Sequence, residues 1–337
     1  NVKAAHDSCI TDKGVTIAVI DTPINLAVPG LVIADIINSP APVCYTKSGV
    51  RQKLSANSTS LAAWHATNVV SLLVGSGKSY SAAQSSALGV APDAKILHYT
   101  AGLPQATGSH YYRCYNAHGD DVSASIISDE IRAAVDAGAQ IISISLGGAD
   151  SSAGNDALAY AEHRGVVVVA SQINNLGQAL GGWPGTGNGV VHVQAGSASG
   201  SVLNDFPLTS VVGPGIGIMT QGDEAQGSWT PTTLSNGTSF ATPIVAGFLA
   251  LAKQKDPNET GNQLIDREAC GQDVDLGIEL MPVVEPCGAA KVVRFFRHAG
   301  RIQRMTQVFP HALGAGRNID HAILRVVGAH GRQRGVE

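Results

Sequence analysis

The chain has 337 residues, of which 14% are charged and 44% hydrophobic, and its formal net charge is −4. These values exclude a disulfide-stapled mini-protein and wholesale disorder, and a charge so close to zero gives no reason to expect a nucleic-acid partner. No apolar run approaches the roughly 18 residues of a membrane-spanning helix, so no transmembrane segment is expected.

Five short runs rich in β-branched residues predict strands, at residues 14–20, 94–100, 139–146, 165–170 and 189–196. Their continuous apolar character is typical of strands buried on both faces, as in a parallel sheet. Helical periodicity lies between and after these strands, at residues 65–74, 122–137, 155–163 and 239–254. The alternation predicts an α/β fold, a doubly wound and mostly parallel sheet with helices on both faces.

Two candidate functional residues come first along the chain. Asp21 directly follows the first strand, at the sheet edge where such folds place their sites, although an aspartate there serves equally well as a turn cap or a ribose ligand. His65 opens the first long helix, and a helix N-terminus disfavours imidazolium and so helps to keep the ring neutral as a base. A lone histidine is more often structural, so neither residue alone establishes chemistry.

Further candidates follow the later strands and open the last helix. The segments 145–148 and 171–175 come after the third and fourth predicted strands. Ser239 lies in the run NGTSFATP, directly before an apolar helix. Because proline is tolerated in the first helical turn, Pro243 places the hydroxyl and the amide of Ser239 at a helix N-terminus. That amide can face a developing oxyanion, although the same pattern can also be a simple N-cap.

The chain order Asp21, His65, Ser239 resembles that of the subtilisin-like serine protease family (subtilases). Three contexts carry the resemblance: VTIAVIDT, HATNVVSLLVG and GTSFATPIVAG. Further segments resemble the stretches between these motifs in the family: LGVAPDAKIL, AQIISISLGG, GVVVVASQINN and GWPG. The resemblance extends over about residues 12–255.

The resemblance implies a serine endopeptidase acting on peptides or proteins. Asp21 would orient His65, His65 would take the proton of the nucleophile Ser239, and Asn174 would donate to the oxyanion, with Asn175 as the alternative. One wall of the substrate-binding pocket would consist of Ser145, Leu146, Gly147 and Gly148. Gly182 aligns with the pocket floor, which leaves room for bulky uncharged side chains. The resemblance also suggests a cis Trp183–Pro184 peptide.

Some positions depart from the family pattern. Pro23, Ala66 and Ile173 stand where the family has glycine, which changes backbone freedom near the site but removes no reacting group. Two alternatives therefore stay open: a transpeptidase or macrocyclase that uses the same acyl-enzyme, and a catalytically impaired homologue that only binds peptides. An NAD-dependent dehydrogenase is disfavoured because no G-x-G-x-x-G follows the first strand.

The five cysteines form no C-x-x-C pair, and Cys44–Cys114 and Cys270–Cys287 are candidate disulfides whose connectivity the sequence leaves open. No cofactor is expected. Calcium is common in the family, but the loop 77–87 lacks carboxylates. A metal cluster around residues 110–118 lacks a fourth ligand, and an aromatic loop beside the cleft is the preferred interpretation. The chain begins at Asn1 without a leader, and a secreted or extracytoplasmic location is expected.

The C-terminal part differs from the rest in composition. Residues 288–337 contain nine basic and two acidic residues, a net charge of +7, which leaves 13 − 24 = −11 for residues 1–287. Strand and helix periodicity also fades after about residue 256. We therefore predict a catalytic domain at residues 1–256 and a basic extension at residues 257–337 that is loosely packed or partly disordered.

Overall fold

The computed structural model describes most of the chain up to residue 270 and three short pieces beyond it. The described residues are 2–52, 55–104, 112–148, 151–175, 182–204, 206, 208–270, 290–291, 293–294 and 308–309. Most of the predicted basic extension, and with it Cys287, lies outside the described residues, so the disorder predicted there and the Cys270–Cys287 pairing stay predictions.

A parallel sheet forms the centre of the molecule. Its eight strands run in the order β13-β9-β8-β7-β6-β1-β3-β2, and every neighbouring pair is parallel. The strands are β1 (Thr16–Asp21), β2 (Ile36–Asn38), β3 (Lys95–Thr100), β6 (Ile141–Ile144), β7 (Val167–Ser171), β8 (Val190–Gly196), β9 (Val211–Pro214) and β13 (Val293–Arg294). The five predicted strands are confirmed, and β2, β9 and β13 are additional.

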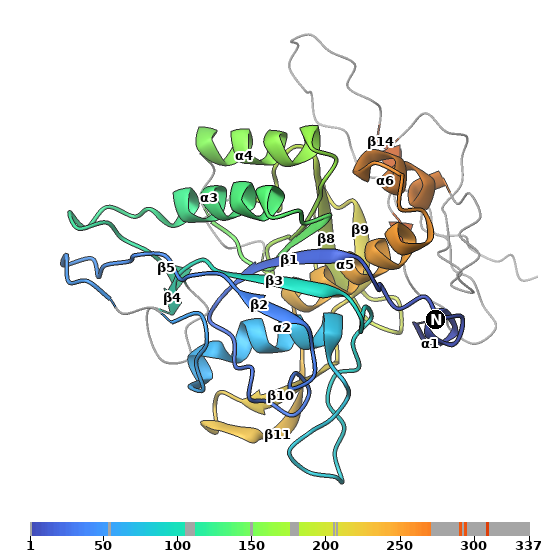
Figure 1. Ribbon diagram of the computed structural model, residues 1–337, viewed down its shortest axis with the longest axis horizontal. Coiled ribbons are helices and arrows are strands. Elements are labelled where there is room, and N and C mark those ends of the chain that lie inside the picture. Colours follow the sequence, from blue (N-terminus) through green and yellow to red (C-terminus); the bar gives the residue numbers. More distant parts are fainter. Residues whose placement is uncertain are drawn as a thin grey trace, which may run out of the picture.

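Four long helices cover the two faces of the sheet (Figure 1). They are α2 (Trp64–Val74), α3 (Ser123–Asp136), α4 (Ser152–His163) and α5 (Thr238–Lys255), which confirms the four predicted helices. One face carries α2 and α5, which pack against each other, and the other carries α3 and α4. The molecule therefore has the doubly wound α/β architecture expected from the alternation of strands and helices.

The side chains of β1 alternate between the two faces of the sheet, so this strand contributes to the hydrophobic core on each face. Ile17 and Val19 are fully buried toward α2 and α5, whereas Ala18 and Ile20 are fully buried toward α3 and α4. Burying each of the larger side chains contributes about 1.5–3 kcal/mol. A strand that is apolar on both sides can only lie inside such a sandwich, which fixes Asp21, its last residue, at the carboxyl edge of the sheet.

Smaller elements surround this core. They are α1 (Val2–Asp7), η1 (Leu61–Ala63), α6 (Gly261–Cys270), the hairpin of β10 (Ile218–Asp223) and β11 (Ser228–Ser235), and the two-residue strands β4 (Leu103–Pro104), β5 (Tyr112–Arg113), β12 (Ala290–Lys291) and β14 (Val308–Phe309). Helix α6 begins beyond residue 256, and its Gly261 amide donates to the Gly165 carbonyl at 3.2 Å while Leu264 is buried. Packing onto the sheet thus continues to Leu264.

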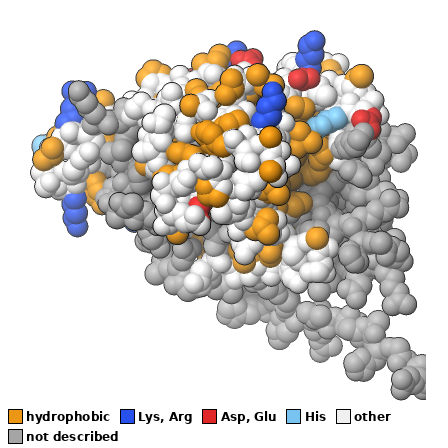
Figure 2. All heavy atoms as spheres, turned by 90° about the horizontal axis from the view of Figure 1, so that it is seen from below, with side chains coloured by type: hydrophobic (Ala, Val, Ile, Leu, Met, Phe, Trp, Pro, Cys, Tyr) orange, Lys and Arg blue, Asp and Glu red, His pale blue; other side chains and the backbone are white. Residues whose placement is uncertain are grey.

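The face that bears the β10–β11 hairpin carries groups of hydrophobic side chains, and most of its charged side chains lie toward the edge of the view (Figure 2). Met219 and Leu234 form a cross-strand pair on the hairpin, and both are exposed. Among the described helices, none combines the length and apolar character that a membrane crossing requires.

A disulfide-tied arm projects beside α3. Cys44 and Cys114 are bonded, which confirms the first of the two candidate pairs. Two turns of the arm pack on each other, and a Cβ on Gly49 would lie 2.9 Å from the Ala117 carbonyl oxygen. Gly49 and Gly119 both have positive φ, at 79° and 86°, so the conformation of each turn favours glycine. At Gly49 the close approach to Ala117 is a further reason for glycine.

Candidate active site

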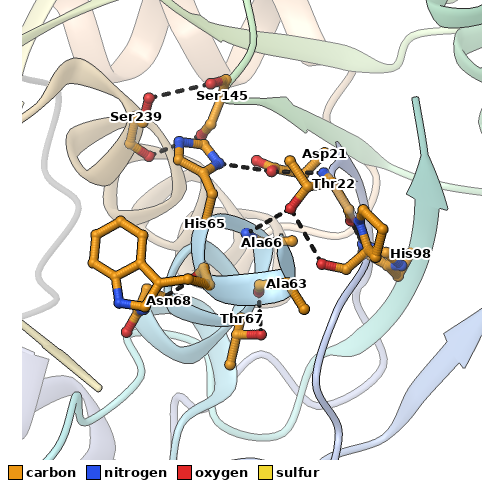
Figure 3. Close-up of polar contacts among 12 residues, drawn as sticks. Asp21, Thr22, Ala63, His65, Ala66, Thr67, Asn68, His98, Ser145 and Ser239 are labelled. Atoms are coloured by element: carbon orange, nitrogen blue, oxygen red, sulfur yellow. Dashed lines mark hydrogen bonds and ion pairs between the residues drawn. The ribbon is translucent and has the colours of Figure 1, made fainter. Parts of the chain in front are cut away.

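Asp21 and His65 form a buried pair where the sheet meets α2. Asp21 ends β1, His65 is the second residue of α2, and His65 Nδ1 lies 2.7 Å from Asp21 Oδ1. Because a carboxylate only accepts hydrogen bonds, the proton of this contact belongs to Nδ1. In neutral His65 the lone pair is then on Nε2, and the ring lies between Asp21 and Ser239 (Figure 3).

The pKa of His65 reflects two opposed effects. Burial alone lowers the pKa, because it penalises the imidazolium. The charge of Asp21 and its hydrogen bond raise it, with a smaller contribution from the charge of Glu224, and together they outweigh burial so that the net pKa lies above its ordinary value. The site therefore stabilises a proton on this histidine.

Thr22 ties the end of β1 to the first turn of α2, and the sequence analysis missed it. Its amide donates to Asp21 Oδ1 at 2.7 Å, and its Oγ1 accepts from the Ala66 amide at 3.1 Å and lies at the same distance from the Pro23 carbonyl, to which it donates. In these contacts Pro23 and Ala66 take part through backbone atoms only. The presence of proline and alanine where the family has glycine is therefore compatible with the Asp21–His65 contact.

His98 is a second buried histidine near Asp21 that was not predicted. It lies on β3 opposite Val19, and its Nε2 is 2.9 Å from the Thr22 carbonyl oxygen, to which it must donate. Burial lowers the pKa of His98 to about 4, against the opposing charge of Asp21. The ring is thus neutral at neutral pH and fixes the Thr22 backbone without adding charge.

Ser239 is the second residue of α5 and contacts Ser145 twice. Its hydroxyl donates to the Ser145 carbonyl at 3.1 Å, and the Ser145 hydroxyl donates to the Ser239 carbonyl at 2.8 Å (Figure 3). Pro243 is the sixth residue of α5 and lies inside the helix, slightly beyond the first turn expected for it. Ser239 nevertheless lies at the helix N-terminus, as the sequence predicted.

Asn174 lies beside the residue that precedes Ser239. Its Oδ1 accepts from the Thr238 amide at 2.8 Å and from the Thr238 hydroxyl at 3.0 Å. These bonds assign the oxygen of the side-chain amide and leave its NH₂ directed away from Thr238. Asn174 itself is an exposed residue. The Asn174 side chain is thus held by Thr238, a residue that sequence reasoning did not single out.

The segment 145–148 and Gly182 are brought together. The Gly148 amide donates to the Trp183 carbonyl at 2.7 Å, and a Cβ on Gly147 would lie 4.0 Å from the Cα of Gly182. Leu146 is buried in the core between the sheet and α3 and α4, so its backbone, not its side chain, faces this region. The Trp183–Pro184 peptide is cis, as the family resemblance suggested.

The structure offers no metal-binding cluster in the part of the chain that it describes. No three His, Cys, Asp or Glu residues gather there in a way that could hold an ion. His110, a member of the disfavoured cluster, lies outside the described residues.

Sequence comparison gives a family and several relatives. The model of the subtilase family (Peptidase_S8) matches residues 12–269. The alkaline protease of Alkalihalobacillus alcalophilus is 30% identical over 264 residues, which are 77% of this chain and 60% of that protein. Subtilisin Savinase of Lederbergia lenta is likewise 30% identical over 264 residues, 77% of this chain and 84% of that protein. The chain thus spans less than two thirds of the alkaline protease.

Solved structures share the fold. The prenylagaramide maturation protease PagA superposes with a TM-score of 0.58 at 20% identity, over 81% of this chain and 88% of that one. Fervidolysin from Fervidobacterium pennivorans, a keratinolytic enzyme related to subtilisin, gives a TM-score of 0.60 at 21% identity, over 87% of this chain and 44% of that one. At such identities the likeness concerns the fold alone.

Proposed function

The chain belongs to the subtilase family, and we propose from this premise that it is a serine endopeptidase that cleaves peptide bonds through an acyl-enzyme on Ser239. The observation that carries the proposal is the 2.7 Å contact between His65 Nδ1 and Asp21, with the imidazole ring between Asp21 and Ser239 (Figure 3). The raised pKa of His65 supports it further, because a general base must hold the proton that it removes.

In the proposed reaction His65 Nε2 takes the proton of the Ser239 hydroxyl as Oγ bonds to the substrate carbonyl carbon. The C–N bond of the tetrahedral adduct then breaks, and His65 returns the proton to the leaving amine. Water attacks the resulting ester in the same way, with His65 as its base, and releases the carboxylic acid and free Ser239. Asp21 keeps its charge throughout and stabilises the transient imidazolium.

Two donors are proposed for the oxyanion. They are the Asn174 side-chain NH₂, which the bonds from Thr238 direct away from α5, and the backbone amide of Ser239 at the helix N-terminus. Such a donor typically contributes about 3 kcal/mol to transition-state stabilisation. Because the Thr238 bonds fix the Asn174 amide before substrate binds, little reorganisation is needed during reaction.

The substrate would be a peptide or protein, and the secreted location of the chain stays part of this proposal. Hydrolysis and ligation share the acyl-enzyme and differ only in whether water or an amine attacks it. The mass of the products separates them, because each hydrolytic cleavage adds one water and transpeptidation adds none.

Labelling with a fluorophosphonate tests the proposal. Folded protein should form an adduct on Ser239, located by peptide mapping, and should cleave an unstructured protein substrate, whereas Ser239→Ala should do neither. Ser201→Ala, which changes an exposed serine, is the matched control and should behave like the native chain. Failure to label Ser239, together with no cleavage by the native chain, contradicts the proposal and favours the homologue that only binds peptides. Unchanged cleavage by Ser239→Ala also contradicts the proposal, because the nucleophile must then be another group.

A further inference from the structure

Two segments flank Ser239 and define where the side chain of an acylated residue must lie. On one side Ser145 exchanges hydrogen bonds with Ser239 at 2.8 and 3.1 Å. On the other side Asn174 holds Thr238 at 2.8 Å. In the acyl-enzyme, the substrate residue is bonded to Ser239 through its carbonyl carbon. If its carbonyl oxygen points to Asn174, the side chain of that residue lies in the space between these two segments.

Two glycines leave bare backbone at the far end of this space. Gly147 and Gly182 face each other, since a Cβ on the first would lie 4.0 Å from the Cα of the second. Both belong to segments joined by the Gly148–Trp183 hydrogen bond of 2.7 Å, which holds their spacing. Taken without their neighbours, the glycines leave room for a large substrate side chain.

Ile173 occupies part of that room. Its Cγ2 lies 2.9 Å from the position that a Cβ on Gly182 would take, a separation that real Cβ contacts essentially never show. The side chain of Ile173 therefore packs against the Gly182 backbone, and the Cγ2 of Thr186 lies 3.8 Å from the same position. Gly182 is buried, so Ile173 cannot move further toward its backbone, whereas the Ile173 side chain itself is only partly buried.

We propose that Ile173 makes the primary specificity pocket shallow, so that the residue whose carbonyl is attacked must be small: glycine, alanine or serine. This inference rests on the proposed function and names its substrate class. A large aromatic or branched side chain would have to displace Ile173 from its contact with the Gly182 backbone, and the cost of that displacement offsets the gain from burying the substrate side chain. The sequence analysis considered Gly182 alone and expected bulky uncharged side chains. With Ile173 taken into account, the expected side chains are small instead.

The test compares peptides that are identical except at the position of the attacked carbonyl, which is Gly, Ala, Ser, Leu or Phe. With the full-length chain, kcat/KM for Ala should exceed that for Phe by about 100-fold. Ile173→Gly and Ile173→Ala remove Cγ2 and should improve Phe relative to Ala by about tenfold or more. Ile173→Val keeps a methyl group at Cγ2 and is the matched control, with an unchanged preference.

Equal cleavage after Phe and Ala by the native chain overturns the inference, as does an Ala-to-Phe ratio that Ile173→Gly leaves unchanged. If Ser239→Ala abolishes cleavage in either case, the proposed function stands. Diphenyl phosphonates that carry an Ala or a Phe side chain give a second measure, the rate of Ser239 modification, should none of the peptides be cut. Absence of any modification of Ser239 overturns both the inference and the proposed function.

Discussion

Pro243 removes a hydrogen-bond donor from the helix that carries Ser239. In a regular α-helix the amide of residue 243 donates to the carbonyl of residue 239, and proline has no amide hydrogen. The hydroxyl of Ser145 donates to this carbonyl instead, at 2.8 Å. One side chain at the end of a strand thus replaces a helical bond and ties the proposed nucleophile to the opposite wall of the site.

Ser145→Ala should therefore destabilise the protein. It leaves the Ser239 carbonyl without this donor, and because this hydrogen bond is only part-buried we expect a cost of about 1 kcal/mol, the lower end of the range for an unpaired acceptor. Urea unfolding gives the free energy of unfolding, measured in a Ser239→Ala background so that self-cleavage cannot distort it. The alanine at 239 keeps the carbonyl that Ser145 contacts.

A second substitution controls for other roles of Ser145. Pro243→Ala restores an amide that can donate to the Ser239 carbonyl, so Ser145→Ala should cost about 1 kcal/mol less in that background than alone. If the cost of Ser145→Ala is the same with and without Pro243, Ser145 does not act through this carbonyl and the explanation above is wrong.

Among the secondary-structure elements, those with a strong hydrophobic pattern could be predicted from the sequence. Those that are strands only through pairing with a neighbouring strand could not. β1 and β7 consist almost entirely of apolar residues up to their last position, and such runs need burial on both faces. β2 has three residues and its Ile37 is 47% exposed, and β9 ends in Gly213 and Pro214, so neither has a pattern that differs from a loop. They are strands because each forms backbone hydrogen bonds with a neighbouring strand of the sheet.

The residues of the candidate site also fall into two groups, those that a local motif identifies and those that only the folded structure brings together. Asp21, His65 and Ser239 lie in local motifs, so the sequence identified them through the family resemblance. His98 could not be found, because its place near Asp21 depends on the register that sets it opposite Val19 on the adjacent strand. The narrowing of the pocket by Ile173 likewise depends on a contact with Gly182 that spacing along the chain does not reveal.

The turn that leads into β1 contains a buried carboxyl group. Asp12 is fully buried with φ of 68°, and neither of its carboxyl oxygens has a hydrogen-bond partner among the described residues. Its amide donates to Gln254 Oε1 at 2.7 Å, which fixes the turn against α5. Burial, with a contribution from the charge of Asp93, raises the pKa of Asp12 to about 9.

This raised pKa makes stability fall as pH rises. Between the ordinary value of 3.8 and about 9 the folded state holds a proton on Asp12 that the unfolded state has lost. Each pH unit in this window therefore costs roughly 1.4 kcal/mol of unfolding free energy. Asp12→Asn keeps a residue that tolerates positive φ and removes the titration. At pH 8, about four units above 3.8, we therefore expect it to stabilise the protein by about 6 kcal/mol.

Urea unfolding from pH 5 to pH 9, again in the Ser239→Ala background, checks this expectation. The gain from Asp12→Asn should grow with pH and nearly vanish toward pH 4, whereas Asp35→Asn, at an exposed position, should change little at any pH. A gain that is constant across the range, or a loss at pH 8, contradicts the protonated state assigned to Asp12.

At the scale of the whole molecule, the disulfide closes a long loop that contains the helix carrying His65. Cys44 and Cys114 are 70 residues apart in sequence, and the loop that they close contains α2 and β3. The arm that they join has little apolar packing of its own, since Val43 and Val50 are 54% and 61% exposed. The covalent link therefore joins the two segments of the arm where apolar packing is sparse.

Replacing both cysteines by alanine should lower the free energy of unfolding by about 4 kcal/mol, the chain-entropy value for a closed loop of this length. The urea midpoint in the Ser239→Ala background measures the loss, and hydrogen exchange should show faster opening of the turns around Gly49 and Gly119 than of β1. Cys9→Ser alters the exposed free thiol and is the control, with no change expected. If the double replacement costs less than 1 kcal/mol while exchange in the arm is unchanged, the contacts between the two turns, and not the disulfide, hold the arm in place.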